Sequence, residues 1–211
     1  MPLIFEQHIN GNAKIGVWEI AESEDFFLKR VAVKKLISHP QKRLQYLAGR
    51  YLLNELYPGF LLDEIRVNEA GKPYLSDGAF HFSVSHCRNY AAAIVSEEEV
   101  VGIDIEIPQQ KIEGIRHKFL SKSEEDILIT TGLDSINAFT IGWSIKEAMF
   151  KWHGEGLVDF KKHLRITNIN NQHGQFIADC IYKGNYEVLL SAPLLQINNF
   201  ILSWVLRKRE Q

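Results

Sequence analysis

Three carboxylates and a lysine, held in two motifs about forty residues apart, could support chemistry on a phosphate-rich substrate. Asp104 and Glu106 stand in the first motif, residues 100–107, and Glu147 and Lys151 stand in the second. Carboxylate oxygens are the ligands that Mg²⁺ prefers, and a bound Mg²⁺ beside a lysine can neutralise a pyrophosphate. The motifs therefore indicate phosphoryl chemistry in a chain whose sequence contains no P-loop motif.

A strand and a helix would have to position these groups. Residues 100–107 alternate β-branched with small or acidic residues, which predicts a strand with Asp104 and Glu106 on one face. A spacing of four places Trp143, Glu147 and Lys151 on one side of a predicted helix. The buried stripe of that helix is predicted to contain Ile145, Ala148, Met149 and Trp152. Two simpler explanations stay open: the solvated face of a sheet for the first motif, and an ordinary i,i+4 ion pair for the second.

Residues 71–86 offer a second group of polar side chains, in a turn followed by a strand. The Gly-Lys-Pro sequence at 71–73 has turn chemistry and presents a cation near its apex. Residues 80–85 alternate, which predicts that Ser85 and the other polar side chains face outward. His86 falls at the predicted end of the strand, where it could bind an anion together with Ser85. A turn, an edge strand and a surface histidine would give the same pattern.

A basic amphipathic helix is predicted over residues 40–57, because apolar residues recur there at helical spacing. Arg43 and Arg50 lie in its first half and could hold a phosphate, since a guanidinium makes bidentate contacts. A solvated face that happens to be basic explains these residues equally well.

In this order the segments resemble the 4′-phosphopantetheinyl transferases, and among them the larger, single-chain type that activates surfactin synthetase. The motifs that carry the resemblance are Leu-Ala-Gly-Arg, Gly-Lys-Pro, Phe-Ser-Val-Ser-His, Val-Gly-Ile-Asp-Ile-Glu and Trp-Ser-Ile-Lys-Glu-Ala-x-x-Lys, within residues 39–160. The resemblance implies transfer of 4′-phosphopantetheine from coenzyme A to a serine of an apo acyl or peptidyl carrier protein, with release of 3′,5′-ADP. It also implies an α+β fold of two similar halves with pseudo-twofold symmetry and an active site in the cleft between them.

The resemblance also implies roles for individual residues. Asp104, Glu106 and Glu147 would bind Mg²⁺, with Mn²⁺ as an alternative, and Glu147 would also be the base for the serine proton. Asp104, Glu147 and Lys151 would form the catalytic set. The coenzyme A side of the site would be built from Arg43, Arg50, Lys72, Pro73, Ser85, His86, Lys146 and Lys151. Ser85 and His86 would bind its 3′-phosphate.

Two further segments bear on the contacts with phosphate and with the carrier protein. Members of the family often carry Gly-Lys-Gly-Leu after the catalytic helix, whereas this chain has Glu155 at the lysine position, so a contact from there to phosphate or carrier is in doubt. Arg116, Lys118 and Phe119 are expected to be exposed and to contact an acidic carrier protein. A packed connector with a charged edge is the alternative.

The domain prediction is an N-terminal half, residues 1–103, with the 3′-phosphate and adenine side of the site, and a C-terminal half, residues 104–211, with the metal and the catalytic helix. The halves are expected to dock tightly as one cooperative unit. Further helices are predicted near 123–130 and 135–153. Strands are predicted near 15–20, 64–68, 80–85, 90–96, 99–107, 164–169, 175–182, 186–192 and 199–207.

Composition sets bounds on function. The chain has 211 residues, 45% of them hydrophobic, and a net charge of −2, which gives no electrostatic reason to expect a nucleic acid or membrane partner. Cys87 and Cys180 indicate reduced thiols, and no signal peptide or membrane-length apolar run is visible. A cytoplasmic monomer is expected. A Mg²⁺-dependent pyrophosphate hydrolase and a non-catalytic coenzyme A-binding protein remain alternative functions.

Overall fold

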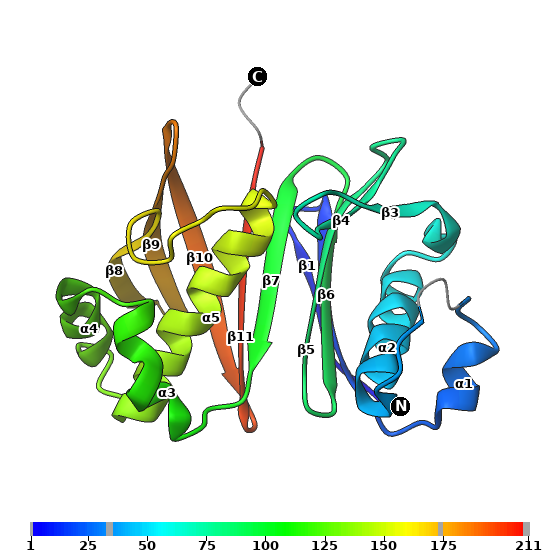
Figure 1. Cartoon of the computed structure of the whole chain (residues 1–211), viewed down its shortest axis with the longest axis horizontal. Coiled ribbons are helices and arrows are strands. Elements are labelled where there is room, and N and C mark those ends of the chain that lie inside the picture. The colour runs from blue at the N-terminus through cyan, green and yellow to red at the C-terminus, as the bar shows by residue number, and fades with distance from the viewer. Residues whose placement is uncertain (1, 33–35, 173–174, 209–211) are drawn as a thin grey trace. The chain divides into compact units, whose positions relative to one another are not determined.

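The computed structural model describes residues 2–32, 36–172 and 175–208, and it divides the chain into two compact units (Figure 1). Unit 1 comprises residues up to 101 together with Lys208, and unit 2 comprises residues 102–207. In each unit helices pack on a mainly antiparallel sheet, so the chain has a mixed α and β fold with several sheets.

The boundary between the units differs slightly from the prediction. Gly102 and Ile103 were expected in the N-terminal half but belong to unit 2, because their strand β7 (Val100–Glu106) joins the sheet of that unit. Lys208 was expected in the C-terminal half but groups with unit 1, where its ammonium lies 2.5 Å from the Glu98 carboxylate. Both differences arise from tertiary pairing that local sequence does not encode.

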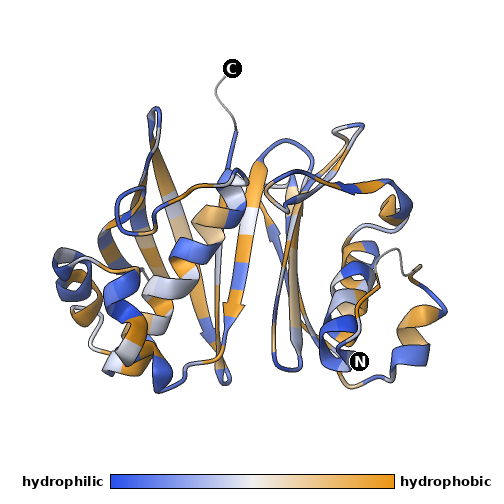
Figure 2. Cartoon of the chain, viewed as in Figure 1, coloured by the Kyte–Doolittle hydropathy of each residue, from blue (hydrophilic) through white to orange (hydrophobic). Residues whose placement is uncertain are grey.

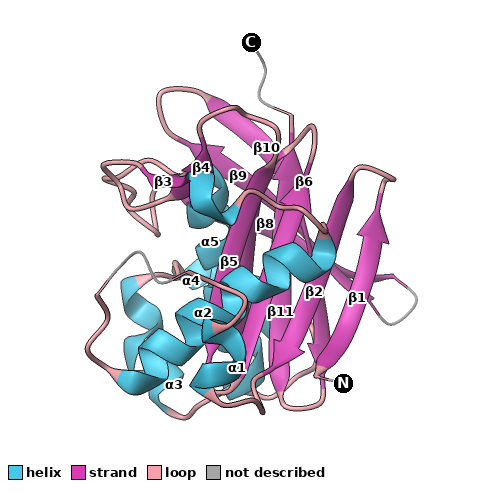
Figure 3. Cartoon of the chain, turned by 90° about the vertical axis from the view of Figure 1, so that its right-hand side faces the viewer, coloured by secondary structure: helices cyan, strands magenta, loops and turns pink. Residues whose placement is uncertain are grey.

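Unit 1 is built on a four-stranded sheet in the order β1-β2-β6-β5. Its strands are β1 (Leu3–Ile9), β2 (Ala13–Glu19), β5 (His81–Cys87) and β6 (Tyr90–Ser96). Its other elements are α1 (Glu24–Leu28), α2 (Pro40–Leu56), a 3₁₀ turn (Leu62–Glu64) and the hairpin of β3 (Ile65–Val67) and β4 (Pro73–Leu75). Helix α2 lies across β2, β5 and β6, and α1 packs beside α2 (Figure 3).

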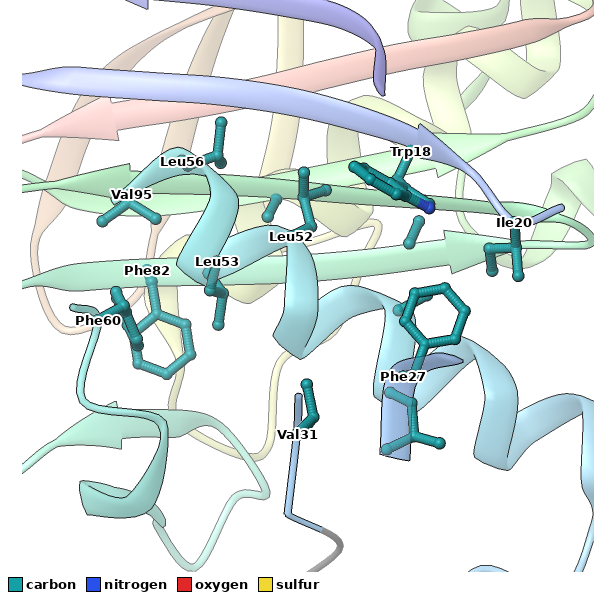
Figure 4. Close-up of a cluster of buried hydrophobic side chains, with 14 of the residues drawn as sticks. Trp18, Ile20, Phe27, Val31, Leu52, Leu53, Leu56, Phe60, Phe82 and Val95 are labelled. Carbon is teal, nitrogen blue, oxygen red and sulfur yellow. The ribbon is translucent and has the colours of Figure 1, made fainter. Parts of the chain in front are cut away.

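The core of unit 1 lies between α2 and this sheet. Helix α2 starts at Pro40, which suits a first helical position, and the Nδ1 atom of His39 accepts a hydrogen bond from the Lys42 amide at 3.5 Å. Its apolar stripe then faces the sheet, and Figure 4 shows these side chains meeting Trp18, Phe82 and Val95. The buried leucines of the stripe are Leu47, Leu52, Leu53 and Leu56. Each contributes about 1.5–3 kcal/mol relative to an exposed side chain.

Unit 2 is built on a five-stranded sheet in the order β7-β11-β10-β9-β8. Besides β7, its strands are β8 (Leu164–Gln172), β9 (Gln175–Lys183), β10 (Glu187–Ile197) and β11 (Phe200–Arg207). Its helices are α3 (Lys111–Ile115), a 3₁₀ turn (Arg116–Lys118), α4 (Lys122–Ile129) and α5 (Ser135–His153). Helix α5 carries both hydrophobic and hydrophilic residues along its length (Figure 2) and packs mainly on β11.

The ends of α5 are well defined by sequence. The Asp134 carboxylate accepts a hydrogen bond from the Asn137 amide at 3.1 Å and so caps the first turn. Gly154 ends the helix in the left-handed conformation, with φ of 71°, which glycine adopts without steric cost.

Gly102 sets the distance between β7 and α5. A Cβ atom at this position would lie 2.0 Å from the Ala148 carbonyl oxygen and 2.4 Å from the Trp152 backbone nitrogen. Both are backbone atoms, so no side chain could fit without separating the strand from the helix. Asp104 follows two residues later on the same face of the strand.

The sequence predictions of the elements are largely confirmed. Each predicted helix and strand is present within a few residues of its expected bounds. The strands β1 and β4 and the short helix α3 were missed, and β4 begins at Pro73, inside the predicted turn. Within the described ranges, no helix has both the length and the apolar character needed to span a membrane. Cys87 and Cys180 are free thiols.

Candidate active site

The carboxylates of β7 meet one side of α5, as the spacing predicted. The Lys151 ammonium lies 2.7 Å from Asp104 Oδ1, and the Trp143 indole N–H donates to Glu106 Oε1 at 3.2 Å. Asp104 and Glu106 are two residues apart on a strand, and Trp143 and Lys151 are two turns apart on the helix, so each strand residue has its own partner. The strand and the helix therefore position four of the predicted groups in unit 2.

Glu147 lies between these two contacts on α5 and is electrostatically coupled to both acids of β7. Burial, as the largest cause, and the negative charges of Asp104 and Glu106 together raise the pKa of its carboxyl to about 7, while the positive charge of Lys151 opposes them. A carboxyl with a pKa near neutrality exchanges its proton readily at physiological pH. Glu147 therefore has the properties required of a general base.

The chemistry of these side chains fits a hard divalent cation, although their arrangement is not a closed cage. Three carboxylates whose mutual repulsion raises a pKa form an oxygen-rich, negatively charged set of the kind that Mg²⁺ or Mn²⁺ prefers. Within residues 2–32, 36–172 and 175–208, however, no group of three or more His, Cys, Asp or Glu side chains is arranged so that it could hold a metal ion. The Lys151 ammonium supplies the positive charge beside Asp104. The metal site therefore stays a prediction.

Lys146 does not lie on the same side of α5 as Glu147 and Lys151. The prediction that it contacts coenzyme A is therefore wrong in this structure. Its side chain is fully buried, and its ammonium lies 2.7 Å from Glu124 Oε1. The same ammonium donates to the Phe119 carbonyl at 2.7 Å and the Phe160 carbonyl at 2.8 Å. These three contacts use all three N–H donors. The physical reason is helical geometry, since the residue before Glu147 projects about 100° away from it.

Glu124 has a structural role at the start of α4. A capping box is present there: the Glu124 carboxylate accepts from the Ser121 amide at 2.8 Å, and Ser121 Oγ accepts from the Glu124 amide. The same carboxylate accepts from the Ile166 amide of β8 at 2.9 Å and pairs with Lys146. Burial lowers the pKa of Lys146, and the charge of Glu124 opposes that shift. No local sequence signal could have joined residues so far apart.

The predicted coenzyme A residues of unit 1 occupy varied environments. Arg43 makes a bidentate pair with Glu24 at 2.7 and 2.9 Å and donates to the Ile37 carbonyl at 3.0 Å, so its guanidinium already has protein partners. The Arg50 guanidinium lies 4.0 Å from the centre of the Tyr46 ring, and burial lowers its pKa.

The turn and strand that follow are also ordered by local bonds. Lys72 stands in a turn in which its amide donates to the Asn68 carboxamide oxygen at 2.8 Å, and Pro73 opens β4. His86 is exposed near the end of β5. Ser85 was expected to face solvent but is buried. The neighbouring strand β6 is buried at every position, so neither face of the sheet is solvated there, which alternation alone does not reveal.

Aromatic side chains enclose Trp143 beside the carboxylates. Phe119 meets the indole edge-on at 5.0 Å between ring centres, and Phe160 stacks on it at 5.5 Å with the planes 21° apart. A pocket of about 1010 Å³ opens beside this group, lined by Ile115, Lys118, Phe119, Ser121, Trp143, Leu157, Val158, Asp159, Phe160, Lys161 and Lys162. A smaller pocket of about 160 Å³ lies against Glu106, and Trp143 lines it too.

The predicted carrier-contact residues are only partly accessible. Phe119 was expected to be exposed, but it is buried because its ring packs on Trp143. Arg116 lies 3.4 Å from the Glu125 carboxylate and faces the Phe139 ring, whereas Lys118 is exposed. Glu155, at the position of the family's lysine, is exposed as well.

Comparison with known proteins gives these observations a family context. Residues 100–204 match the model of the 4′-phosphopantetheinyl transferase superfamily (ACPS). The chain is 34% identical to a Haemophilus influenzae protein named provisionally as a 4′-phosphopantetheinyl transferase, over 46% of this chain and 43% of the relative. It is 34% identical to the 4′-phosphopantetheinyl transferase AcpT of Salmonella typhimurium, over 54% of this chain and 60% of the relative. It is 33% identical to the 4′-phosphopantetheinyl transferase ffp of Bacillus subtilis, over 42% of this chain and 40% of the relative. The chain thus spans about half the length of these relatives. Asp104, Glu106, Glu147 and Lys151 all lie within the matched family domain.

Proposed function

We propose that this chain, whose residues 100–204 carry a domain of the 4′-phosphopantetheinyl transferase superfamily, transfers 4′-phosphopantetheine from coenzyme A to a serine of an apo acyl or peptidyl carrier protein. The observation that supports this most directly is the placement of Glu147. Its carboxyl has a pKa of about 7 and lies among Asp104, Glu106 and Lys151, inside the matched domain.

In the proposed reaction the serine hydroxyl attacks the pantetheine-side phosphorus of coenzyme A. The bond from that phosphorus to the bridging oxygen breaks, and 3′,5′-ADP leaves with the bond electrons. The Glu147 carboxylate takes the serine proton. Lys151 turns from Asp104 toward the pyrophosphate and stabilises the charge that builds up on the leaving group.

The negative side chains of the site would hold the metal on which this chemistry depends. Asp104, Glu106 and Glu147 would be the ligands of a Mg²⁺ ion, with Mn²⁺ as a substitute. When bound, the ion would neutralise the pyrophosphate as a Lewis acid. Trp143 would keep the Glu106 carboxylate oriented through its N–H bond, and Asp104 would exchange the Lys151 ammonium for the metal.

The coenzyme A side of the site is proposed on resemblance alone. Exposed His86 and the cation of Lys72 are the favoured partners for the 3′-phosphate and adenine, whereas Arg43 would first have to leave Glu24. By the same resemblance we propose that the two units are similar α/β halves. The larger, surfactin-activating subtype, a monomeric state and a cytoplasmic location belong to this proposal.

Intact-mass spectrometry of an apo carrier protein tests the function. The carrier is incubated with this protein, coenzyme A and Mg²⁺, with an EDTA control and with the variants Glu147→Gln and Glu155→Gln. A mass gain of one phosphopantetheine group in the wild type and in Glu155→Gln, but not in Glu147→Gln or with EDTA, supports the assignment. Glu155 is an exposed acid eight residues from Glu147, so it controls for loss of charge alone.

The same experiment without carrier protein separates the other functions. Steady Mg²⁺-dependent cleavage of coenzyme A alone would instead indicate a pyrophosphate hydrolase. Binding of coenzyme A without transfer to any fatty-acid, polyketide or non-ribosomal peptide carrier would indicate a non-catalytic binding protein.

A further inference from the structure

The ammonium of Lys146 contacts the backbone of the same two residues whose rings enclose Trp143. It donates to the carbonyls of Phe119 and Phe160, which lie on different segments before and after α5. Lys146 also follows Trp143 by three residues on α5, so the indole and the ammonium start from the same part of the helix. One buried cation thus ties two separate segments to the helix turn that carries the indole.

The anchor of this cation is itself immobilised. Glu124 pairs with Lys146 at 2.7 Å and accepts hydrogen bonds from the amides of Ser121 and Ile166, which join α4 and β8. Neither side chain of the pair is exposed to solvent. A cation with every donor occupied, paired with a carboxylate bound on several sides, has little freedom to change its position.

The enclosed indole points its N–H at a proposed metal ligand. Phe119 meets the indole edge-on and Phe160 stacks on it, at 5.0 and 5.5 Å between ring centres, so packing sets the orientation of the indole. Its N–H then donates to Glu106 Oε1 at 3.2 Å. Such outer contacts orient the groups that touch a metal or substrate.

We propose that Lys146, Glu124 and Trp143 form a positioning relay, in which the buried ion pair holds Phe119 and Phe160, these rings fix the indole, and the indole orients the Glu106 carboxylate. The inference rests on the proposed function for its catalytic consequence, although the relay itself is a property of unit 2 alone. In this proposal the adjacent residues Lys146 and Glu147 of α5 have separate roles. Lys146 maintains the geometry of the site from inside the domain, and Glu147 acts on the substrate.

The relay is tested with three variants and a matched control. Trp143→Phe keeps a ring that can contact Phe119 and Phe160 but removes the N–H donor. Phe160→Leu removes the stacked ring and leaves the carbonyl that Lys146 binds. Lys146→Met removes the ammonium. The control is Lys122→Met, which deletes an exposed lysine whose ion pair with Asp126, at 2.8 Å, lies outside the relay.

Three measurements are made on each folded variant: direct Mn²⁺ binding by electron paramagnetic resonance, the emission of Trp143 taken as the difference from Trp143→Phe, and kcat and KM for coenzyme A. We expect Trp143→Phe to lower Mn²⁺ affinity and kcat by about 10–100-fold, with little change in KM for coenzyme A. Phe160→Leu and Lys146→Met should change in the same direction and also shift the Trp143 emission. The control should match the wild type in every measurement.

A purely structural role gives a different pattern. Lys146→Met would then lower the melting temperature while Mn²⁺ affinity, kcat and Trp143 emission below that temperature stayed as in the wild type, and this result would overturn the relay. If Lys146→Met does not fold, unchanged Mn²⁺ affinity in both Trp143→Phe and Phe160→Leu overturns it. A wild-type protein that binds Mn²⁺ without transferring phosphopantetheine refutes only the proposed function. A wild-type protein that binds no Mn²⁺ refutes the metal site and the relay together.

Discussion

Helix α5 makes two lysine–carboxylate pairs of equal length in very different surroundings. In both, the ammonium lies 2.7 Å from a carboxylate oxygen: Lys146 from Glu124, and Lys151 from Asp104. Both side chains of the first pair are 0% exposed, whereas Lys151 is 25% exposed and Asp104 is 4% exposed. The buried pair is closed by further contacts to backbone, while the second pair keeps one side toward solvent.

This difference shows that ion-pair length does not distinguish a fully buried pair from a partly exposed pair that is proposed to act in catalysis. The Lys146 ammonium has no donor left for a substrate, and separating it from Glu124 would deprive two buried charges of the ionic partner that lies closest to each. Lys151 can exchange Asp104 for another anion at much smaller cost, because water reaches it. What separates the two roles is whether a side chain can leave its partner.

The largest expected effect is on the side of α5 that carries Glu147 and Lys151, which we call the open side because Lys151 is partly exposed to solvent. Glu147→Gln should lower the rate of phosphopantetheine transfer by about 10³–10⁴-fold, or about 4–5.5 kcal/mol of activation free energy, because it removes the base and a metal ligand together. Stability should not fall, since the substitution removes a carboxyl whose ionisation burial opposes. Transfer rates and urea unfolding, measured side by side, check both statements. A variant with normal turnover would refute the role of Glu147.

A matched pair of charge deletions compares the two ion pairs directly. Lys146→Met should lower the free energy of unfolding by about 3–5 kcal/mol, because Glu124 is left charged and buried. Lys151→Met should lower it by about 1 kcal/mol or less, since this pair is partly solvated, yet should reduce transfer strongly. Urea denaturation of the two variants gives the comparison. Equal losses of stability would show that exposure does not separate the pairs.

The pH dependence of stability gives a smaller effect, specific to the open side. In metal-free protein the Glu147 pKa of about 7 lies above the value of 4.5 expected for an unfolded chain, so the folded state binds more protons between these pH values. The free energy of unfolding should therefore decrease as pH rises from about 4.5 to 7, by about 1–2 kcal/mol after allowance for solvent screening. Glu147→Gln should remove this slope. A slope that persists unchanged in the variant would assign it to other groups.

The smallest effect concerns the end of the helix just beyond Lys151. Gly154→Ala should cost about 1 kcal/mol of stability, because φ of 71° is unfavourable for a residue with a Cβ atom. The cost should appear in thermal unfolding, with a modest loss of activity if the last turn of α5 frays. A loss of activity as large as that of Glu147→Gln would mean that the end of the helix is part of the reacting site.

The placement of the residues on the open side of α5 could be predicted from sequence, whereas the contacts of the buried Lys146 could not. Periods of two and four placed Asp104, Glu106, Glu147 and Lys151 correctly, because those periods follow from backbone geometry alone. Lys146 has the same residue type as Lys151 and stands beside the proposed base, so sequence gave no reason to separate their roles. Its partner Glu124 lies across a helix–helix contact, which only tertiary structure reveals.

Burial was the second kind of information that sequence lacked. Ser85 and Phe119 both lie where a local pattern predicts exposure, and both are buried. Alternation shows that a strand has two faces, but it does not show whether the second face is covered. An apolar residue among cations can belong to a binding surface or to a packed connector. Phe119 belongs to a packed connector, because its ring packs against Trp143.

Gly102 has no side chain that could react, yet the position of Asp104 relative to Lys151 depends on it. The space between β7 and the backbone of α5 at this residue admits a hydrogen atom and little more. A methyl group there would act as a wedge, and it would move Asp104 away from Lys151 without altering either side chain. If Asp104 and Lys151 act as proposed, selection on them extends to Gly102, and we expect a lineage that keeps the proposed activity to tolerate no more variation at residue 102 than at the acids themselves.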